Sequence, residues 1–131
     1  LQEMIPTGNR SLRVAVIGRR FVAYWRVQPD RQKWYANLAH GGQIDFMADP
    51  ELRAMAVSAV RNFCGFTRID LAGFDLLFPE GAASATPFFL EINYFFGRRG
   101  LGGSQAYYRI LVQEIDNWLS RNGLETTRAD R

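Results

Sequence analysis

Two acidic residues interrupt apolar, strand-like segments in the second half of this 131-residue chain: Asp75 lies in the run AGFDLLF and Glu91 in the run FFLEIN. Burying a carboxylate among apolar side chains is costly unless a positive charge or a hydrogen-bond donor meets it. The fold therefore has to supply partners for both carboxylates, and this requirement constrains the chain more than any other feature.

The spacing of these residues predicts a cation site. Residues i and i+2 of a strand point to the same face, so Glu91 and Asn93 project together, and Asp75 joins them if the two strands pair. Two carboxylates and an amide oxygen suit a hard cation such as Mg²⁺, which completes its coordination with waters and phosphate oxygens. The alternative is that each acid forms a structural ion pair with a nearby arginine. We favour the cation because these residues occur beside arginine-containing glycine loops.

The rest of the chain predicts hairpins and helices. Strands are expected at residues 12–17, 21–27, 43–47, 69–78 and 88–93, and helices at residues 50–64 and 104–122. Asp49 is the expected N-cap of the first helix and Gly65 its stop, while Ser104 is the expected cap of the second. Hairpins beside helices indicate an α+β fold, an antiparallel sheet with helices packed on one face. We expect a single domain over residues 1–131 with a polar tail at 124–131.

Composition excludes several classes of protein. Hydrophobic residues make up 47% and charged residues 22%, which argues against disorder, and no apolar run reaches the roughly 18–20 residues that span a bilayer. The lone Cys64 cannot form an internal disulfide and is expected to pack in the core, so we expect a cytoplasmic protein. A net charge of +3 gives little support for nucleic-acid binding. Because the chain opens with Leu1, we expect a fragment of a longer protein.

The second half of the chain contains the segments AGFDLLF and FLEIN, followed by a glycine loop and a closing helix. Together these features resemble the C-terminal part of an ATP-grasp domain, most closely the RimK-like amino-acid ligase branch. The hairpin SLRVAVIGRRFVA, the segment YANLAHGG and the opening LQEMI extend the resemblance over most of the chain. The resemblance implies the C-terminal lobe of an ATP-grasp fold. In such a domain ATP and Mg²⁺, or Mn²⁺ in its place, bind between two lobes.

The resemblance also implies roles for particular residues. Asp75, Glu91 and Asn93 would hold the metal, and three arginines would contact the transferring phosphoryl group or acyl phosphate. Those arginines are Arg13, Arg98 and Arg99. The residues that would contact the nucleotide are Glu3, Met4, Ile5, Asn37 and Leu90.

The implied activity is that of a carboxylate–amine ligase. ATP phosphorylates a small-molecule or peptide carboxylate, and an amine attacks the acyl phosphate to form an amide. The isolated chain is expected to be inactive, because the resemblance assigns the phosphate-binding lysines to an N-terminal lobe. A homo-oligomer is compatible with this activity, and no membrane is implied.

The chain departs from the family pattern at three positions, where Ser11, Tyr35 and His40 replace an aspartate and two arginines. These departures favour an alternative, a non-catalytic module that binds nucleotide or a protein partner. A third possibility, an RNA-binding α+β domain, rests on the doublets Arg19-Arg20 and Arg98-Arg99. A P-loop is excluded, because the glycine loop at residues 97–104 lacks the Gly-Lys-[Ser/Thr] ending.

Overall fold

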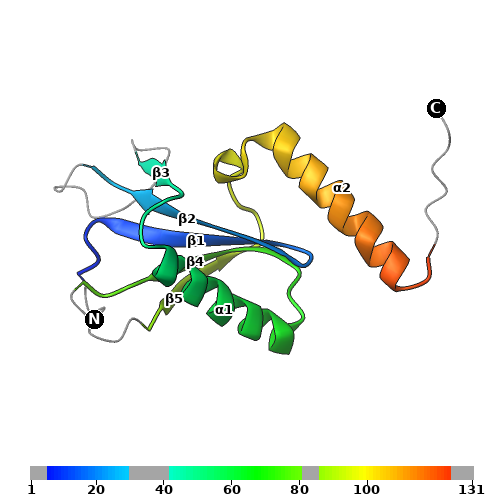
Figure 1. The fold of residues 1–131 in the computed structure, drawn as a ribbon, viewed down its shortest axis with the longest axis horizontal. Helices are drawn as coiled ribbons and strands as arrows, with labels where there is room; N and C mark the ends of the chain where they lie inside the picture. The colour runs from blue at the N-terminus through cyan, green and yellow to red at the C-terminus, as the bar shows by residue number, and fades with distance from the viewer. Residues whose placement is uncertain (1–5, 30–41, 81–85, 125–131) are drawn as a thin grey trace.

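The computed structural model describes residues 6–29, 42–80 and 86–124, and over these the chain forms an α+β fold with a five-stranded antiparallel sheet and two α-helices (Figure 1). The order along the sheet is β3-β2-β1-β4-β5, so the first strand is central. The elements are β1 (Arg10–Ile17), β2 (Arg20–Val27), β3 (Gln43–Asp45), α1 (Pro50–Thr67), β4 (Leu71–Leu77), β5 (Phe88–Asn93), the 3₁₀-helix η2 (Arg99–Leu101) and α2 (Ser104–Arg121).

Both predicted strand pairs form. Strands β1 and β2 pair antiparallel from Ile17 opposite Arg20, which leaves Gly18 and Arg19 as a two-residue turn. Gly18 has a φ of 60°, the left-handed conformation that such tight hairpins need. Strands β4 and β5 pair antiparallel as well, and β4 runs without a break through Gly73.

One face of the sheet packs on α1. The alternating residues Leu12, Val14 and Val16 of β1 are fully buried, in one cluster with Ala56 and Val60 of the helix. The apolar face of the alternating strand thus packs on the apolar stripe of the helix, which is how a sheet and a helix usually form a hydrophobic core. Within the described residues, neither helix is apolar enough over its length to cross a membrane.

The expectation that the helices pack on one face is wrong. Ala15 and Ile17 point to the opposite face of β1, where they cluster with Leu101 of η2 and Tyr107 of α2. The cause is in the sequence of the central strand, because residues 12–17 are apolar on both faces except at Arg13. A central strand of this kind needs cover on both sides.

The first helix is longer than predicted. It passes through the exposed Gly65 and ends at Thr67, followed by Arg68 in a left-handed conformation with a φ of 61°. The N–H of Arg68 donates to the carbonyl of Cys64 at 2.9 Å. A glycine inside a helix lowers helix stability by only about 1 kcal/mol, and the stabilisation from the helical turns on either side outweighs this cost.

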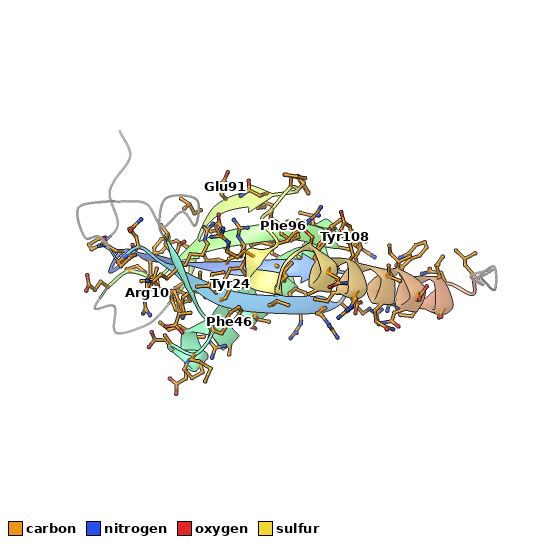
Figure 2. The ribbon with its side chains drawn as sticks, turned by 90° about the horizontal axis from the view of Figure 1, so that it is seen from above. Arg10, Tyr24, Phe46, Glu91, Phe96 and Tyr108 are labelled. Carbon is orange, nitrogen blue, oxygen red and sulfur yellow. The ribbon has the colours of Figure 1, made fainter. Side chains whose placement is uncertain are left out.

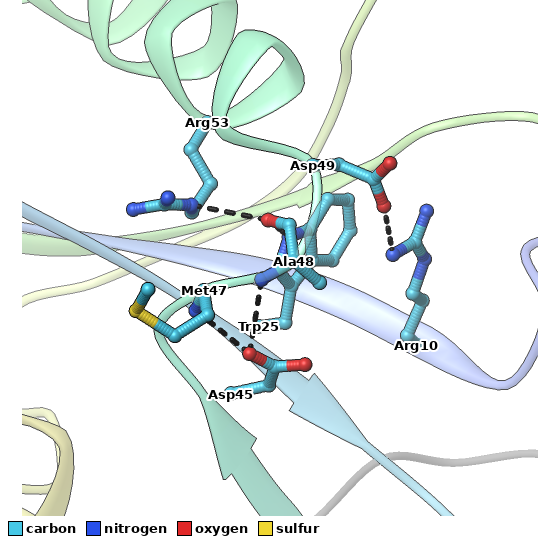
Figure 3. Close-up of polar contacts among 7 residues, drawn as sticks. All are labelled: Arg10, Trp25, Asp45, Met47, Ala48, Asp49 and Arg53. Atoms are coloured by element: carbon cyan, nitrogen blue, oxygen red, sulfur yellow. Dashed lines mark hydrogen bonds and ion pairs between the residues drawn. The ribbon is translucent and has the colours of Figure 1, made fainter.

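Asp49 occupies the N-cap position of α1 as predicted, but its side chain does not cap the helix (Figure 3). Its carboxylate instead pairs with the guanidinium of Arg10. The turn before the helix is fixed by Asp45, whose Oδ1 accepts from the N–H groups of Met47 at 2.7 Å and Ala48 at 3.0 Å. These two hydrogen bonds lower the pKa of the Asp45 carboxyl.

Candidate functional site

Four polar side chains form a row across the sheet on the face turned away from α1. The strand register sets Tyr24 of β2 opposite Arg13 of β1, Arg13 opposite Asp75 of β4, and Asp75 opposite Glu91 of β5. Direct cross-strand neighbours have Cβ atoms about 4.5–5.5 Å apart and point to the same face. Figure 2 labels Tyr24 and Glu91 at the two ends of this row. The predicted pairing of Asp75 with Glu91 is therefore confirmed.

Asp75 is buried and held by two guanidinium groups. Nε and Nη2 of Arg13 donate to its two carboxylate oxygens, the second at 2.9 Å, and Nη2 of Arg26 lies 2.9 Å from Oδ2. Arg26 also donates to Oγ of Ser11 at 3.2 Å. The relative exposure of Asp75 is 4% and that of Arg13 is 5%. The structural ion pair considered from the sequence thus exists for Asp75.

Burial and charge set the protonation of this row. Burial by itself would lower the pKa of the Arg13 guanidinium, but the hydrogen bonds and negative charge of Asp75 outweigh it and raise the pKa. Burial raises the pKa of the Tyr24 hydroxyl, although the charges of Arg13 and Arg26 act in the opposite direction. At neutral pH Arg13 is therefore cationic and Tyr24 is a neutral phenol.

A bulge in β5 decides which side chains join the row. The register pairs Asp75 with Glu91 but Leu76 with Phe89, so Leu90 is the extra residue. This insertion lets Phe89 pack toward the ring of Phe63 in α1, with centroids 5.4 Å apart, while Glu91 stays in register with Asp75. Bulges of this kind commonly re-aim side chains near functional sites. Leu90 itself is 59% exposed.

The loop after β5 folds over the same face. Asn93 pairs in register with Gly73, and a Cβ added to Gly73 would lie 2.9 Å from Cβ of Phe96. Further along, a Cβ added to Gly100 would lie only 2.0 Å from Cζ of Tyr24. Glycine is required at both positions because aromatic groups occupy the space beside them. The loop thereby covers the inner part of the row, while Glu91 stays exposed.

The two loop arginines differ in their surroundings. Arg98 donates to the hydroxyl of Tyr108 at 2.9 Å, and its guanidinium lies 4.7 Å from the ring centres of Tyr107 and Tyr108. Its contacts anchor the loop to α2 rather than to the acidic pair. Arg99 is exposed at the start of η2. Of the arginines predicted to act at the site, only Arg13 contacts a predicted metal ligand in the described residues.

The donor set of the predicted metal site is only partly accessible. Glu91 is exposed and Asn93 half-buried, and both supply hard oxygen donors of the kind that Mg²⁺ takes. Asp75 supplies a second carboxylate one strand away, already engaged by arginines. No cluster of three or more His, Cys, Asp or Glu side chains occurs in the described part of the chain. The residues therefore fit a cation that shares its coordination with phosphate oxygens better than one enclosed by protein.

The remaining predicted nucleotide contacts, Glu3, Met4, Ile5 and Asn37, lie outside the described residues, as do Tyr35 and His40. Cys64 is half-buried, and burial raises the pKa of its thiol. That pKa makes the thiolate scarce at neutral pH and agrees with a packing role rather than a nucleophilic one.

Sequence reasoning missed Arg26 and Tyr24. The signal was present in the hairpin, because a two-residue turn at Gly18 and Arg19 sets Tyr24 opposite Arg13 and Arg26 opposite Ser11. Counting back from the turn would have placed both side chains on the face of Arg13.

A comparison with protein-family profiles finds no family that matches this chain, and a comparison with curated protein sequences finds no significant match.

Proposed function

We propose that this chain is the nucleotide- and magnesium-binding lobe of an ATP-dependent carboxylate–amine ligase of the ATP-grasp type, which acts through an acyl phosphate. One observation carries the proposal: Asp75 and Glu91 are direct cross-strand partners, and Arg13 follows in the same row. Two carboxylates on neighbouring strands beside a fixed guanidinium supply the charges that phosphoryl transfer needs.

The geometry supports distinct roles within the row. Glu91 and Asn93, on the accessible strand β5, would hold Mg²⁺ together with Asp75. When bound, the cation supplies charge neutralisation at the phosphate oxygens. Arg13 and Arg26 keep two positive charges fixed beside the acidic pair. Because both are held by Asp75, they lose little conformational freedom when anionic oxygens approach.

The nucleotide and the acceptor have different candidate contacts. Leu90 is exposed at the bulge, next to Glu91, so it offers an apolar surface to the base. Arg99 is exposed in the loop that covers the row, where it can meet an anionic group of the acyl phosphate. The reaction needs no nucleophilic side chain, because the amine substrate supplies the attacking nitrogen.

Thermal unfolding with and without Mg·ATP tests this proposal. A ligand at about 100 times its dissociation constant adds roughly 2.7 kcal/mol of stability, a shift of several degrees in Tm for a domain of this size. We expect a magnesium-dependent shift in the wild-type chain and its loss in Glu91→Gln. The matched control is Glu51→Gln, which removes an exposed carboxylate in the first turn of α1 and should keep the shift.

A second candidate function also has support. Both oxygens of Asp75 already accept from guanidinium groups, as in a purely structural ion pair. A non-catalytic module derived from such a ligase would retain this row as part of its fold. It predicts the absence of a magnesium-dependent shift in the wild-type chain, and also in a longer protein that contains it.

A further inference from the structure

A second charged region lies at the other end of the hairpin, away from the acidic pair. In Figure 1 the β1–β2 turn points between the end of α1 and the helix α2. A surface hollow of about 860 Å³ opens there. Four arginines line it, each from a different part of the fold: Arg19 from the turn, Arg61 from the body of α1, Arg68 from the end of α1, and Arg121 from the end of α2.

The surrounding protein offsets the charge of these arginines only in part. Within residues 6–29, 42–80 and 86–124, none of the four forms an ion pair. The acid that lines the hollow is Asp70. The carbonyl ends of α1 and α2 also approach it, and each counts as about half a negative charge. The carboxylate of Glu114 lies beside the turn as well, where its Oε2 accepts a hydrogen bond from the N–H of Arg19 at 3.2 Å. Four positive charges against about three negative ones leave a net charge of about +1.

The backbone at Arg68 points to a use for its side chain. This residue has a φ of 61° at the end of α1, a position where glycine or asparagine is usual. A larger residue there costs of order 1 kcal/mol. Strain of this kind tends to persist where a side chain has a function. In the described part of the chain, Arg68 forms no ion pair that would compensate for this strain.

A second arginine is held in place before any ligand arrives. The guanidinium of Arg61 lies 4.8 Å from the ring centre of Phe21, at the start of β2. Stacking on an aromatic ring fixes the planar fork and leaves its N–H groups at the edge for another partner. The hollow thus contains a positioned guanidinium as well as a concentration of charge.

We propose that this hollow binds a small anion that carries two or more phosphoryl groups. Guanidinium groups bind phosphate oxygens in pairs of parallel hydrogen bonds, and the four arginines that line the hollow exceed what one phosphate can use. The volume lies in the range of small-molecule sites. The site is separate from the row of Asp75 and Glu91, and it needs no divalent cation.

Titration calorimetry of the 131-residue chain with inorganic pyrophosphate, in the presence of a chelator, tests this site. We expect saturable binding that weakens as salt is raised. Arg68→Gly should weaken it about tenfold, equivalent to about 1.4 kcal/mol, without lowering Tm, because glycine relieves the left-handed strain. Arg121→Gln should weaken binding by a similar factor.

Two control variants make the result decisive. Arg109→Gln removes an equal charge from an exposed position of α2 that does not line this hollow, and should change affinity less than about twofold. Glu91→Gln alters the proposed magnesium site and should leave pyrophosphate binding unchanged. Absence of saturable binding in the wild-type chain, or an equal loss in Arg109→Gln, would overturn the proposal without bearing on the ligase.

Discussion

Arg13 of β1 and Asp75 of β4 are direct cross-strand neighbours and form a bidentate ion pair. The relative exposure is 5% for Arg13 and 4% for Asp75. Their contact is the centre of the polar row, and it joins the stability of the fold to the chemistry proposed for it. Arg26 adds a second guanidinium to the same carboxylate. Because one acid meets two cations, removal of that acid and removal of its exposed neighbour Glu91 should have very different consequences.

Asp75→Asn should destabilise the fold by about 3–5 kcal/mol, because it leaves the buried guanidinium of Arg13 and the half-buried one of Arg26 beside a neutral amide. Glu91→Gln should change stability by no more than about 0.5 kcal/mol, since Glu91 is exposed. Urea unfolding of both variants measures the difference. Equal losses would mean that the row is not organised around the buried ion pair.

Gly100→Ala should destabilise the protein by about 1–3 kcal/mol or more, because the new methyl group would overlap the ring of buried Tyr24. The matched control is Gly97→Ala in the same loop, where a Cβ meets nothing within 4 Å. It should change stability by at most about 0.5 kcal/mol. Thermal unfolding of the two variants measures the difference. Equal stability of Gly100→Ala and the wild type would show that η2 does not pack tightly against Tyr24.

The stability of the fold should fall with alkali because of Tyr24. Its folded-state pKa is raised above the ordinary 10.0, so the unfolded chain loses this proton first. The contribution is complete below the unfolded pKa and is lost as the pH rises through the folded pKa. Tyr24→Phe should reduce the fall of the unfolding free energy with rising pH, measured by urea unfolding between about pH 8 and pH 11. An unchanged slope would contradict burial of the hydroxyl.

Leu90→Ser should separate nucleotide binding from folding. The side chain is 59% exposed at the bulge, so its loss should alter stability by less than about 1 kcal/mol. If Leu90 contacts the base, the Kd for Mg·ATP should rise several-fold. Val112→Ser, at a half-exposed position of α2, is the control for general loss of apolar surface. Equal ATP affinity in wild type and Leu90→Ser would remove Leu90 from the site.

Much of the fold follows from local patterns. The hairpin, the helix beginning at Pro50, and the pairing of the strands around Asp75 and Glu91 were all predictable from alternation and turn residues. The coverage of the second sheet face by η2 and α2 was not predicted, although β1 is apolar on both sides. The end of α1 at Arg68 was not predictable either, since no local preference places arginine in a left-handed conformation.

The acidic residues of the candidate site were predictable from the sequence, and its arginines were less so. Asp75 and Glu91 stand out because carboxylates are rare in apolar strands. Arg26 lies in a strand whose alternation is mixed, so its approach to Asp75 depends on the hairpin register rather than on any local signal. The bulge at Leu90 depends on cross-strand pairing and on the packing of Phe89, which no single strand encodes.

The central claim is that the acidic pair of β4 and β5 binds a divalent cation together with nucleotide. Paramagnetic Mn²⁺ with ATP tests it at residue resolution, because the ion broadens the NMR signals of nearby amides. We predict selective broadening at residues 73–75 and 91–93, reversed by excess Mg²⁺ and absent in Glu91→Gln. Broadening centred elsewhere, or equal broadening in that variant, would contradict the claim.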